Sequence, residues 1–302
     1  MQTPPLLIGT SGGLFGLDGE EHREFTNQMV TSLAVREGTA WAIVDGREIW
    51  RSDRGDRWQS VAEVKDRKAT CILPARSGVL VGTAEAHLLQ LRDGGLETVT
   101  SFDHIDGREE WFTPWGGPPA TRSLSEGPTG TLYANIHVGG VVRSTDGGKH
   151  WRPTMEIEAD VHQVLAHPRD ASLVFAASGI GLGTSDDGGE TWTFRRAGLH
   201  ATYQRAVAVA DDGVLVSTSQ SERGRQSAVY RLALGKRPHF EKCEEGLPTW
   251  FSDNIDTYCL VALGPVAVIA DPNGTLFISD NGGDSWAKLA GDLPPIRCVS
   301  FA

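Results

Sequence analysis

Short runs of aliphatic and β-branched residues alternate with turns rich in Gly, Asp and Asn along the whole chain. Runs of this length between turn residues are typical of β-strands. One stretch shows the pattern most clearly and predicts a four-stranded antiparallel unit, with strands over 161–166, 173–177, 181–184 and 192–195. Similar runs occur before and after it, so the sequence predicts an all-β protein made of repeated four-stranded sheets.

A second periodic feature is an eight-residue pattern, Ser-x-Asp-x-Gly-x-Thr-Trp, which we call the signature turn. Its four copies span 52–58, where one residue is missing, 144–151, 185–192 and 279–286. The Asp side chain is suited to accept hydrogen bonds from its own turn, and glycine permits positive φ angles. The Trp side chain can bury a large apolar area. We therefore predict a structural role, between the third and fourth strands of a unit.

The spacing of the Trp residues predicts seven units. Trp151 and Trp192 are 41 residues apart, whereas the steps of 93 and 94 residues to the other copies leave room for two units each. The seven predicted anchors are Phe25, Trp58, Phe102, Trp151, Trp192, Phe240 and Trp286. The prediction is a seven-bladed β-propeller, a single domain over 1–302. Its ring closes when a strand over 296–301 pairs with strands over 6–9 and 13–17, which removes an exposed sheet edge.

Composition narrows the classes of partner. The formal net charge of −11, with 39 acidic and 28 basic residues, argues against a nucleic-acid partner. No apolar run is long enough to span a membrane, and no basic and apolar leader follows Met1. We therefore expect a soluble cytoplasmic protein with no membrane partner. The four cysteines form no C-x-x-C pair, and we expect them to be core residues rather than metal ligands.

Candidate chemistry lies where the seven inner strands begin. When these strands are aligned on their aliphatic positions, the residues two positions earlier share one strand face. They should surround the channel mouth, on the face opposite the signature turns. They are Thr31, Thr70, Arg122, His162, Arg205, Tyr258 and Arg297. Guanidinium groups suit a carboxylate, sulfate or phosphate, whereas His162 suits a general acid or base and Tyr258 a proton donor or nucleophile. The alternative is that the ring only bridges neighbouring blades.

Long loops on the same face add to this candidate site. Asp256, at the predicted start of the sixth inner strand, is a carboxylate partner for the arginines, and acidic residues at 156, 158 and 160 are alternative partners. Trp111, Trp115 and Trp250 lie in loops over 103–119 and 243–254. Such aromatic residues form the apolar wall of a pocket or a platform for a sugar ring, or else they pack against the rim.

A metal site is a further alternative. His137 and His162 should approach each other from adjacent blades, and imidazole ligands suit zinc or another transition metal. No tightly spaced ligand motif accompanies them. We therefore predict no metal ligand and no cofactor from the sequence, and keep a divalent metal at His137 and His162 as the alternative.

The four signature turns and the blade period resemble the BNR/Asp-box repeat superfamily, which includes sialidases, receptors, glycoside hydrolases and photosystem assembly factors. The stretches 136–144 and 160–164 look like bacterial propellers labelled only as glycosyl-hydrolase-like. The resemblance covers the whole chain and implies the propeller fold. The Arg-Ile-Pro element of sialidases is missing, so the resemblance does not imply a typical sialidase.

These observations lead to one hypothesis and two alternatives. The leading hypothesis is a sialidase-like propeller whose mouth binds a small anionic or glycan-derived ligand and acts on it by hydrolysis or elimination. In that hypothesis Arg122, Arg205 and Arg297 bind the anion, and His162 and Tyr258 transfer protons. The first alternative is a non-catalytic scaffold for a protein partner. The second is a metal-dependent enzyme that uses His137 and His162.

Overall fold

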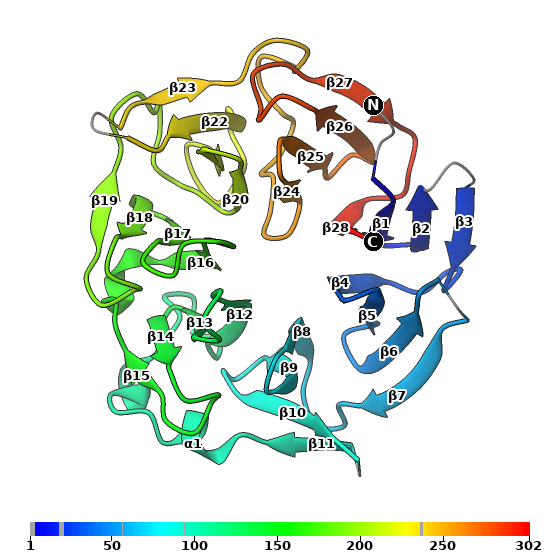
Figure 1. Cartoon of the computed structure of the whole chain (residues 1–302), viewed down its shortest axis with the longest axis vertical. Helices are drawn as coiled ribbons and strands as arrows, with labels where there is room; N and C mark the ends of the chain where they lie inside the picture. Colours follow the sequence, from blue (N-terminus) through cyan, green and yellow to red (C-terminus); the bar gives the residue numbers. More distant parts are fainter. Residues whose placement is uncertain (1–3, 18–20, 56, 94, 236–237) are drawn as a thin grey trace.

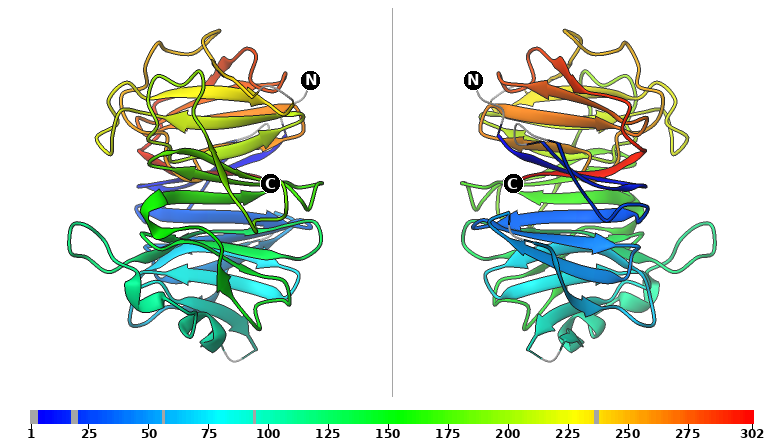
Figure 2. Two further views of the ribbon diagram at one scale, coloured as in Figure 1. Left: turned by 90° about the vertical axis from the view of Figure 1, so that its left-hand side faces the viewer. Right: turned by 90° about the vertical axis from the view of Figure 1, so that its right-hand side faces the viewer.

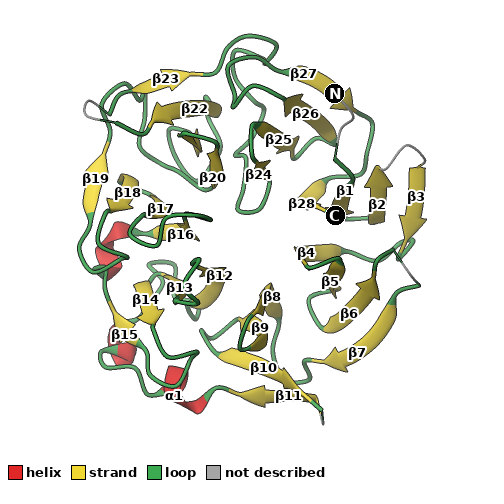
Figure 3. Cartoon of the chain, in the orientation of Figure 1, coloured by secondary structure: helices red, strands yellow, loops and turns green. Residues whose placement is uncertain are grey.

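The computed structural model confirms the predicted architecture. It describes residues 4–17, 21–55, 57–93, 95–235 and 238–302. Seven four-stranded antiparallel sheets form a ring around a central channel (Figure 1). Strands make up the blades, and the helical turns lie in the connections between them (Figure 3).

The first four blades follow the chain from the innermost to the outermost strand. Blade 1 contains β4 (Val30–Arg36), β5 (Thr39–Val44), β6 (Glu48–Asp53) and β7 (Gln59–Glu63). Blade 2 contains β8 (Ala69–Ala75), β9 (Gly78–Thr83), β10 (Leu88–Arg92) and β11 (Gly95–Thr98). Blade 3 contains β12 (Ala120–Glu126), β13 (Leu132–His137), β14 (Gly140–Ser144) and β15 (Arg152–Pro153). Blade 4 contains β16 (Val161–Ala166), β17 (Val174–Ser178), β18 (Gly181–Ser185) and β19 (Thr193–Arg195).

The remaining blades complete the ring. Blade 5 contains β20 (Val207–Ala210), β21 (Gly213–Thr218), β22 (Ala228–Ala233) and β23 (Phe240–Lys242). Blade 6 contains β24 (Leu260–Leu263), β25 (Val266–Asp271), β26 (Thr275–Ser279) and β27 (Ala287–Ala290). Blade 7 contains β28 (Ile296–Phe301), β1 (Leu6–Thr10), β2 (Gly13–Leu17) and β3 (Glu21–Glu24). Three helical turns occur in the connections: α1 (Thr100–Asp103), η1 (Arg108–Glu110) and η2 (Ile157–Ala159).

The two ends of the chain close the ring in blade 7, as predicted. The C-terminal strand β28 pairs antiparallel with β1, for example through Val299 and Ile8. Because β1 and β2 continue the same sheet, the innermost strand comes from one end of the chain and the other three from the opposite end. Figure 2 shows the resulting disc from its sides. This closure leaves no blade with an unpaired inner strand.

The hydrophobic core lies between adjacent blades. Its largest cluster combines buried residues of three blades, including Leu215, Ile269 and Ile8. The anchors were predicted less accurately than the blade count. Phe102 lies in α1, after the outer strand β11, and packs edge-on against Trp151 of the next blade at a centroid distance of 5.2 Å. Phe25 likewise follows β3. Both rings are therefore inter-blade packing residues rather than counterparts of the Trp residues that precede outer strands.

The signature turns connect the third and fourth strands of blades 1, 3, 4 and 6, as predicted. In blade 4 the Asp187 carboxylate accepts hydrogen bonds from the Glu190 and Thr191 amides, both at 2.9 Å. Asn281 takes the same position in blade 6 and accepts from the Ser285 amide at 3.0 Å. The turn in blade 1 includes residue 56, which is outside the described residues. In blades 3, 4 and 6 the polar side chain at this position is thus held by its own turn.

Candidate functional site

The predicted ring residues occupy equivalent positions in five blades because each is the extra residue of a β-bulge. In blade 3, for example, Thr121 pairs with Ile136 and Ser123 with Asn135, which leaves Arg122 unpaired between them. The same shift occurs at Thr31, Thr70, His162 and Arg297. A bulge bends its strand and redirects the side chain of the extra residue.

Blades 5 and 6 differ from that pattern. Their inner strands begin at Val207 and Leu260, so Arg205 and Tyr258 precede the strands. Asp256 was expected to begin the sixth inner strand, but it lies in a tight turn, in which the Cys259 amide donates to the Asp256 carbonyl. Tyr258 has a left-handed backbone, with φ of 64°.

Tyr258 extends into the central channel rather than joining the arginines. Its hydroxyl accepts a hydrogen bond from the Leu124 amide of blade 3 at 3.1 Å, across the ring. Its ring packs against the hydrophobic clusters of blades 1 to 3 and 7. Burial, with a further contribution from the Cys71 thiol, raises its pKa well above the usual value. These surroundings do not suit the proton transfer that the sequence suggested.

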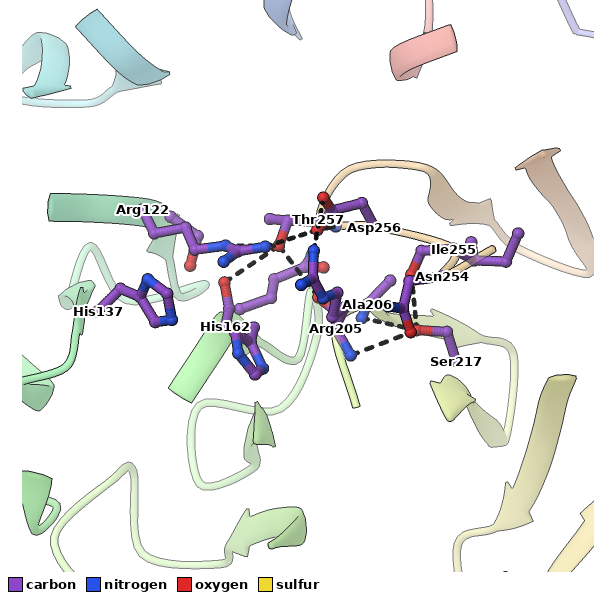
Figure 4. A network of polar contacts seen from close by, with 12 residues as sticks. Arg122, His137, His162, Arg205, Ala206, Ser217, Asn254, Ile255, Asp256 and Thr257 are labelled. Atoms are coloured by element: carbon purple, nitrogen blue, oxygen red, sulfur yellow. Dashed lines mark hydrogen bonds and ion pairs between the residues drawn. The ribbon is translucent and has the colours of Figure 1, made fainter. Parts of the chain in front are cut away.

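Arg122 and Arg205 meet at one carboxylate. Arg122 Nη2 lies 2.6 Å from Asp256 Oδ1, and Arg205 Nη1 lies 3.1 Å from Asp256 Oδ2 (Figure 4). The two guanidinium groups therefore approach Asp256 from blades 3 and 5. Thr257 supports the arrangement, because its hydroxyl lies 3.2 Å from Arg122 Nε. The sequence thus predicted the correct carboxylate partner for two of its three arginines.

Asp256 is held in its ionised form. Burial alone would favour the neutral acid, but the charges of Arg122 and Arg205 and the hydrogen bond from the Thr257 amide outweigh it. Together they lower the pKa of Asp256 to about 2. At neutral pH this carboxylate is an acceptor and a counter-ion, and it has no proton to donate.

His162 is fully buried beside this network. Its Nδ1 lies 2.6 Å from the Gln204 carbonyl oxygen, and Nδ1 must carry the proton because a carbonyl can only accept. Burial and the charge of Arg122 lower the pKa of His162 well below the usual value, which the nearby Asp160 only partly offsets. The ring is therefore neutral, and it does not suit the role of general acid at neutral pH.

His137 and Asp160 lie on the Nε2 side of the His162 ring. The ring centroids of His137 and His162 are 5.2 Å apart. Asp160 Oδ1 is 3.3 Å from His137 Nε2, and Asp160 Oδ2 is 3.5 Å from His162 Nε2. The potential ligand atoms of the three residues all lie within 4.8 Å of one another. The sequence paired the two histidines correctly but did not identify Asp160 as the third member.

Polar atoms without partners are concentrated here. Among the described residues, nine buried side-chain nitrogen and oxygen atoms have no hydrogen-bond partner. Three of them belong to side chains of this site: Asp160 Oδ1, His162 Nε2 and Arg205 Nε. Because an unpartnered buried polar group is costly, such groups are expected to contact a water molecule, an ion or a ligand.

The other predicted site residues lie outside this network. Arg297 is exposed and makes no hydrogen bond or ion pair with the described residues. Thr31 and Thr70 donate to backbone carbonyls of Ile43 and Thr121. The ring prediction therefore identified equivalent backbone positions, but only three of its seven side chains, Arg122, His162 and Arg205, gather at one place.

The three tryptophans also differ in their surroundings. Trp111 is buried and packs against Phe102 rather than beside the arginines. Trp250 packs against His200, away from the arginines, with Lys242 Nζ 3.9 Å from its ring centroid. Trp115 is 65% exposed, and its ring centroid is 5.2 Å from that of His137. Only Trp115 borders the site.

Two site residues had no signal in the sequence. Tyr203 packs edge-on against His162 at 4.8 Å and accepts a hydrogen bond from Arg205 Nη2 at 3.4 Å. Gln204 provides the carbonyl that orients His162. Both lie in the connection before β20, where no periodic pattern assigns a direction to a side chain.

The comparisons with known proteins identify the fold. No protein-family model and no curated protein matches the chain. Among solved structures, an ancestral GH74 enzyme is similar over 97% of this chain and 41% of its own, with 13% identity and a TM-score of 0.64. The GH74 xyloglucanase from Xanthomonas campestris matches over 94% of this chain and 46% of its own, with 17% identity and a TM-score of 0.60. BamB from Moraxella catarrhalis matches over 97% and 85%, with 15% identity and a TM-score of 0.56.

The chain thus spans less than half the length of these two GH74 enzymes. At such identities the likeness establishes the fold and not an activity. Within the described ranges, no helix is long and apolar enough to cross a membrane. The chain is a seven-bladed β-propeller with structural neighbours among the GH74 glycoside hydrolases.

Proposed function

We propose that the protein binds a small anionic or glycan-derived ligand at the channel mouth. The main support for this proposal is that Arg122 and Arg205 both contact Asp256 at the channel mouth. We also infer from the four signature turns that the chain is of the BNR/Asp-box, sialidase-like type.

The donor groups at the mouth support an anion. Asp256 offsets only one of the two guanidinium charges that meet at its carboxylate. Arg205 Nε is a buried donor without a partner among the described residues. Forked guanidinium donors match the geometry of carboxylate, sulfate and phosphate oxygens. A ligand with such oxygens would satisfy donors that the protein leaves free.

The experiment is a binding measurement with opposite expectations for two variants. Sulfate, phosphate and D-glucuronate are titrated into the protein by calorimetry, with D-glucose as the neutral probe. Arg205→Ala removes a charged donor and is expected to weaken anion binding by about tenfold or more. Asp256→Asn removes the competing negative charge and is expected to strengthen anion binding, while D-glucose binding stays unchanged.

The matched control is Arg231→Ala. This side chain is as buried as Arg205, at 23% exposure, but it pairs with Asp212 and Asp284 away from the mouth. It should leave anion binding unchanged. If Arg205→Ala binds the anions as tightly as the unaltered protein, or if Asp256→Asn binds them more weakly, the proposal is wrong.

A further inference from the structure

We propose that His137, Asp160 and His162 form a binding site for one divalent transition-metal ion. This goes beyond the anion site, because it concerns acceptor atoms rather than the arginine donors. It also adds Asp160 to the two histidines that the sequence brought together. The arrangement of two imidazoles and one carboxylate is a known ligand set for zinc and for non-haem iron.

The first support is the orientation of His162. Since its Nδ1–H donates to the Gln204 carbonyl, the Nε2 atom carries a lone pair. Nε2 is buried and accepts no hydrogen bond from the described residues. A histidine whose Nδ1–H is fixed by a backbone carbonyl while Nε2 stays free is oriented as a metal ligand.

The second support is the contact between His162 and Asp160. His162 Nε2 and Asp160 Oδ2 are 3.5 Å apart, and both are acceptors when the histidine is neutral. Two acceptors at this distance repel each other unless a positive group lies between them. Asp160 Oδ1 is also buried, and its contact with His137 Nε2 at 3.3 Å does not meet the geometry of a hydrogen bond. A cation between these atoms would remove the repulsion and give Asp160 Oδ1 a partner.

The third support is the backbone that presents the carboxylate. Asp160 ends η2 in a left-handed conformation, with φ of 49° and ψ of 62°. The Gly179 amide donates to the Asp160 carbonyl at 2.9 Å, and a Cβ at Gly179 would lie 2.9 Å from Asp160 Oδ2. The carboxylate therefore has a defined place between β16 and the β17–β18 turn, rather than a free position on the surface.

The distances fit one ion. Ligand atoms bound at about 2.1 Å in tetrahedral geometry lie about 3.4 Å apart. The two contacts of Asp160, at 3.3 and 3.5 Å, match this value. No pair of ligand atoms exceeds 4.8 Å, and a small turn of the His137 ring, the more exposed of the two imidazoles, would bring all three into range.

Three protein ligands leave coordination positions open for water or for an oxygen of a ligand, as in catalytic zinc sites. Figure 4 shows Arg122 extending past His137 and His162 toward Asp256. An anion held by Arg122 would therefore lie next to the ion.

The test uses metal ions alone. The full chain is freed of metal with a chelator, and Zn²⁺ and Mn²⁺ binding is measured by calorimetry, with Co²⁺ absorption as a readout of the ligand set. We expect one ion per chain. Asp160→Asn and His137→Ala should each weaken binding by about a hundredfold or more, since changes even to groups that only support ligands cost ten- to a hundredfold. Circular dichroism shows whether each variant folds.

The control is His104→Ala, because this histidine is exposed and lies apart from the cluster. It should leave the affinity and the Co²⁺ spectrum unchanged. The proposal is overturned if no ion binds stoichiometrically, or if folded Asp160→Asn and His137→Ala bind as tightly as the unaltered protein; a water molecule would then occupy the gap. Failure of the metal titration leaves the anion titration with Arg205→Ala standing, so the two proposals fail separately.

Discussion

Polar side chains form hydrogen bonds within their own turn in the signature turns, whereas at the channel mouth they contact residues of other blades. In the turn of blade 4 the Asp187 carboxylate is held by Ser185, Glu190 and Thr191, all within six residues of sequence. At the mouth, Arg122, Arg205 and Asp256 come from three different blades. Several buried atoms beside them have no partner among the described residues.

This difference separates structure from function within one fold. A turn whose carboxylate already accepts hydrogen bonds from the same turn stabilises its blade, and that carboxylate is not free to bind a ligand. Buried donors and acceptors without hydrogen bonds lower the stability of the folded protein. Where a protein retains them, they are typical of positions that bind a water molecule, an ion or a ligand. The repeated motif is therefore the structural feature, and the unrepeated residues at the mouth are the functional candidates.

The largest expected effect is on the structural side. Trp286 is buried, and its Nε1 donates to the Gly283 carbonyl at 3.0 Å within the fourth signature turn. Trp286→Ala should lower the free energy of unfolding by about 3–5 kcal/mol, because it leaves a cavity between blades. Chemical denaturation measures the loss. Metal affinity of the folded variant should not change; a parallel loss of metal binding would contradict the separation of the two regions.

Tyr258→Phe is expected to have an intermediate effect. It removes the hydroxyl that accepts the Leu124 amide across the channel and leaves that amide without its partner. The free energy of unfolding should fall by about 1–3 kcal/mol. We expect anion affinity and any hydrolytic rate to stay within about twofold, because the hydroxyl is held inside the channel. A large loss of rate at unchanged stability would instead restore Tyr258 as a proton donor.

The smallest expected effect concerns Asp187 and depends on pH. Hydrogen bonds from the Thr191 hydroxyl and amide lower the pKa of this carboxyl. A lowered native pKa gives stability that is present above the unfolded value, about 4, and is lost as pH falls toward the native pKa. Asp187→Asn should therefore be less stable than the unaltered protein at pH 7, and this difference should shrink steadily as the pH falls from about 4 to pH 2.

The matched control for this prediction is Asp186→Asn. Asp186 is the exposed neighbour of Asp187, and it makes no hydrogen bond with the described residues. It should show no such difference between the two pH values. Asn281, which fills the equivalent position in blade 6 without a charge, indicates that the turn itself tolerates the amide. A pH-independent loss in Asp187→Asn would mean that geometry, and not charge, provides the stability.

The fold was predictable because its signals are periodic. Strand alternation and the Trp spacing determine the blades, and the closure by 296–301 follows from the count. Alignment of the inner strands also located real equivalences, since Arg122 and His162 are both bulge residues. Strand register, however, determines where a residue lies on its strand and does not determine which residues its side chain contacts. Arg297 shares the bulge position but not the site, and Tyr258 precedes its strand and extends into the channel.

The missing members of the site come from irregular connections. Asp160 ends a helical turn in a left-handed conformation, and Tyr203 and Gln204 precede β20. Their side-chain directions depend on backbone angles that no hydrophobic pattern encodes. The signal in the sequence is the position of Asp160 two residues before His162, and it fits a partner for the arginines as well as a third metal ligand.

The most direct test of the account is anomalous diffraction at the zinc absorption edge from crystals of the protein soaked in zinc chloride. The account predicts one strong peak bounded by His137 Nε2, His162 Nε2 and the Asp160 carboxylate, and no such peak in Asp160→Asn. Zinc found only elsewhere on the surface, or none at this position in the unaltered protein, would contradict the claim that the mouth is a metal-binding site.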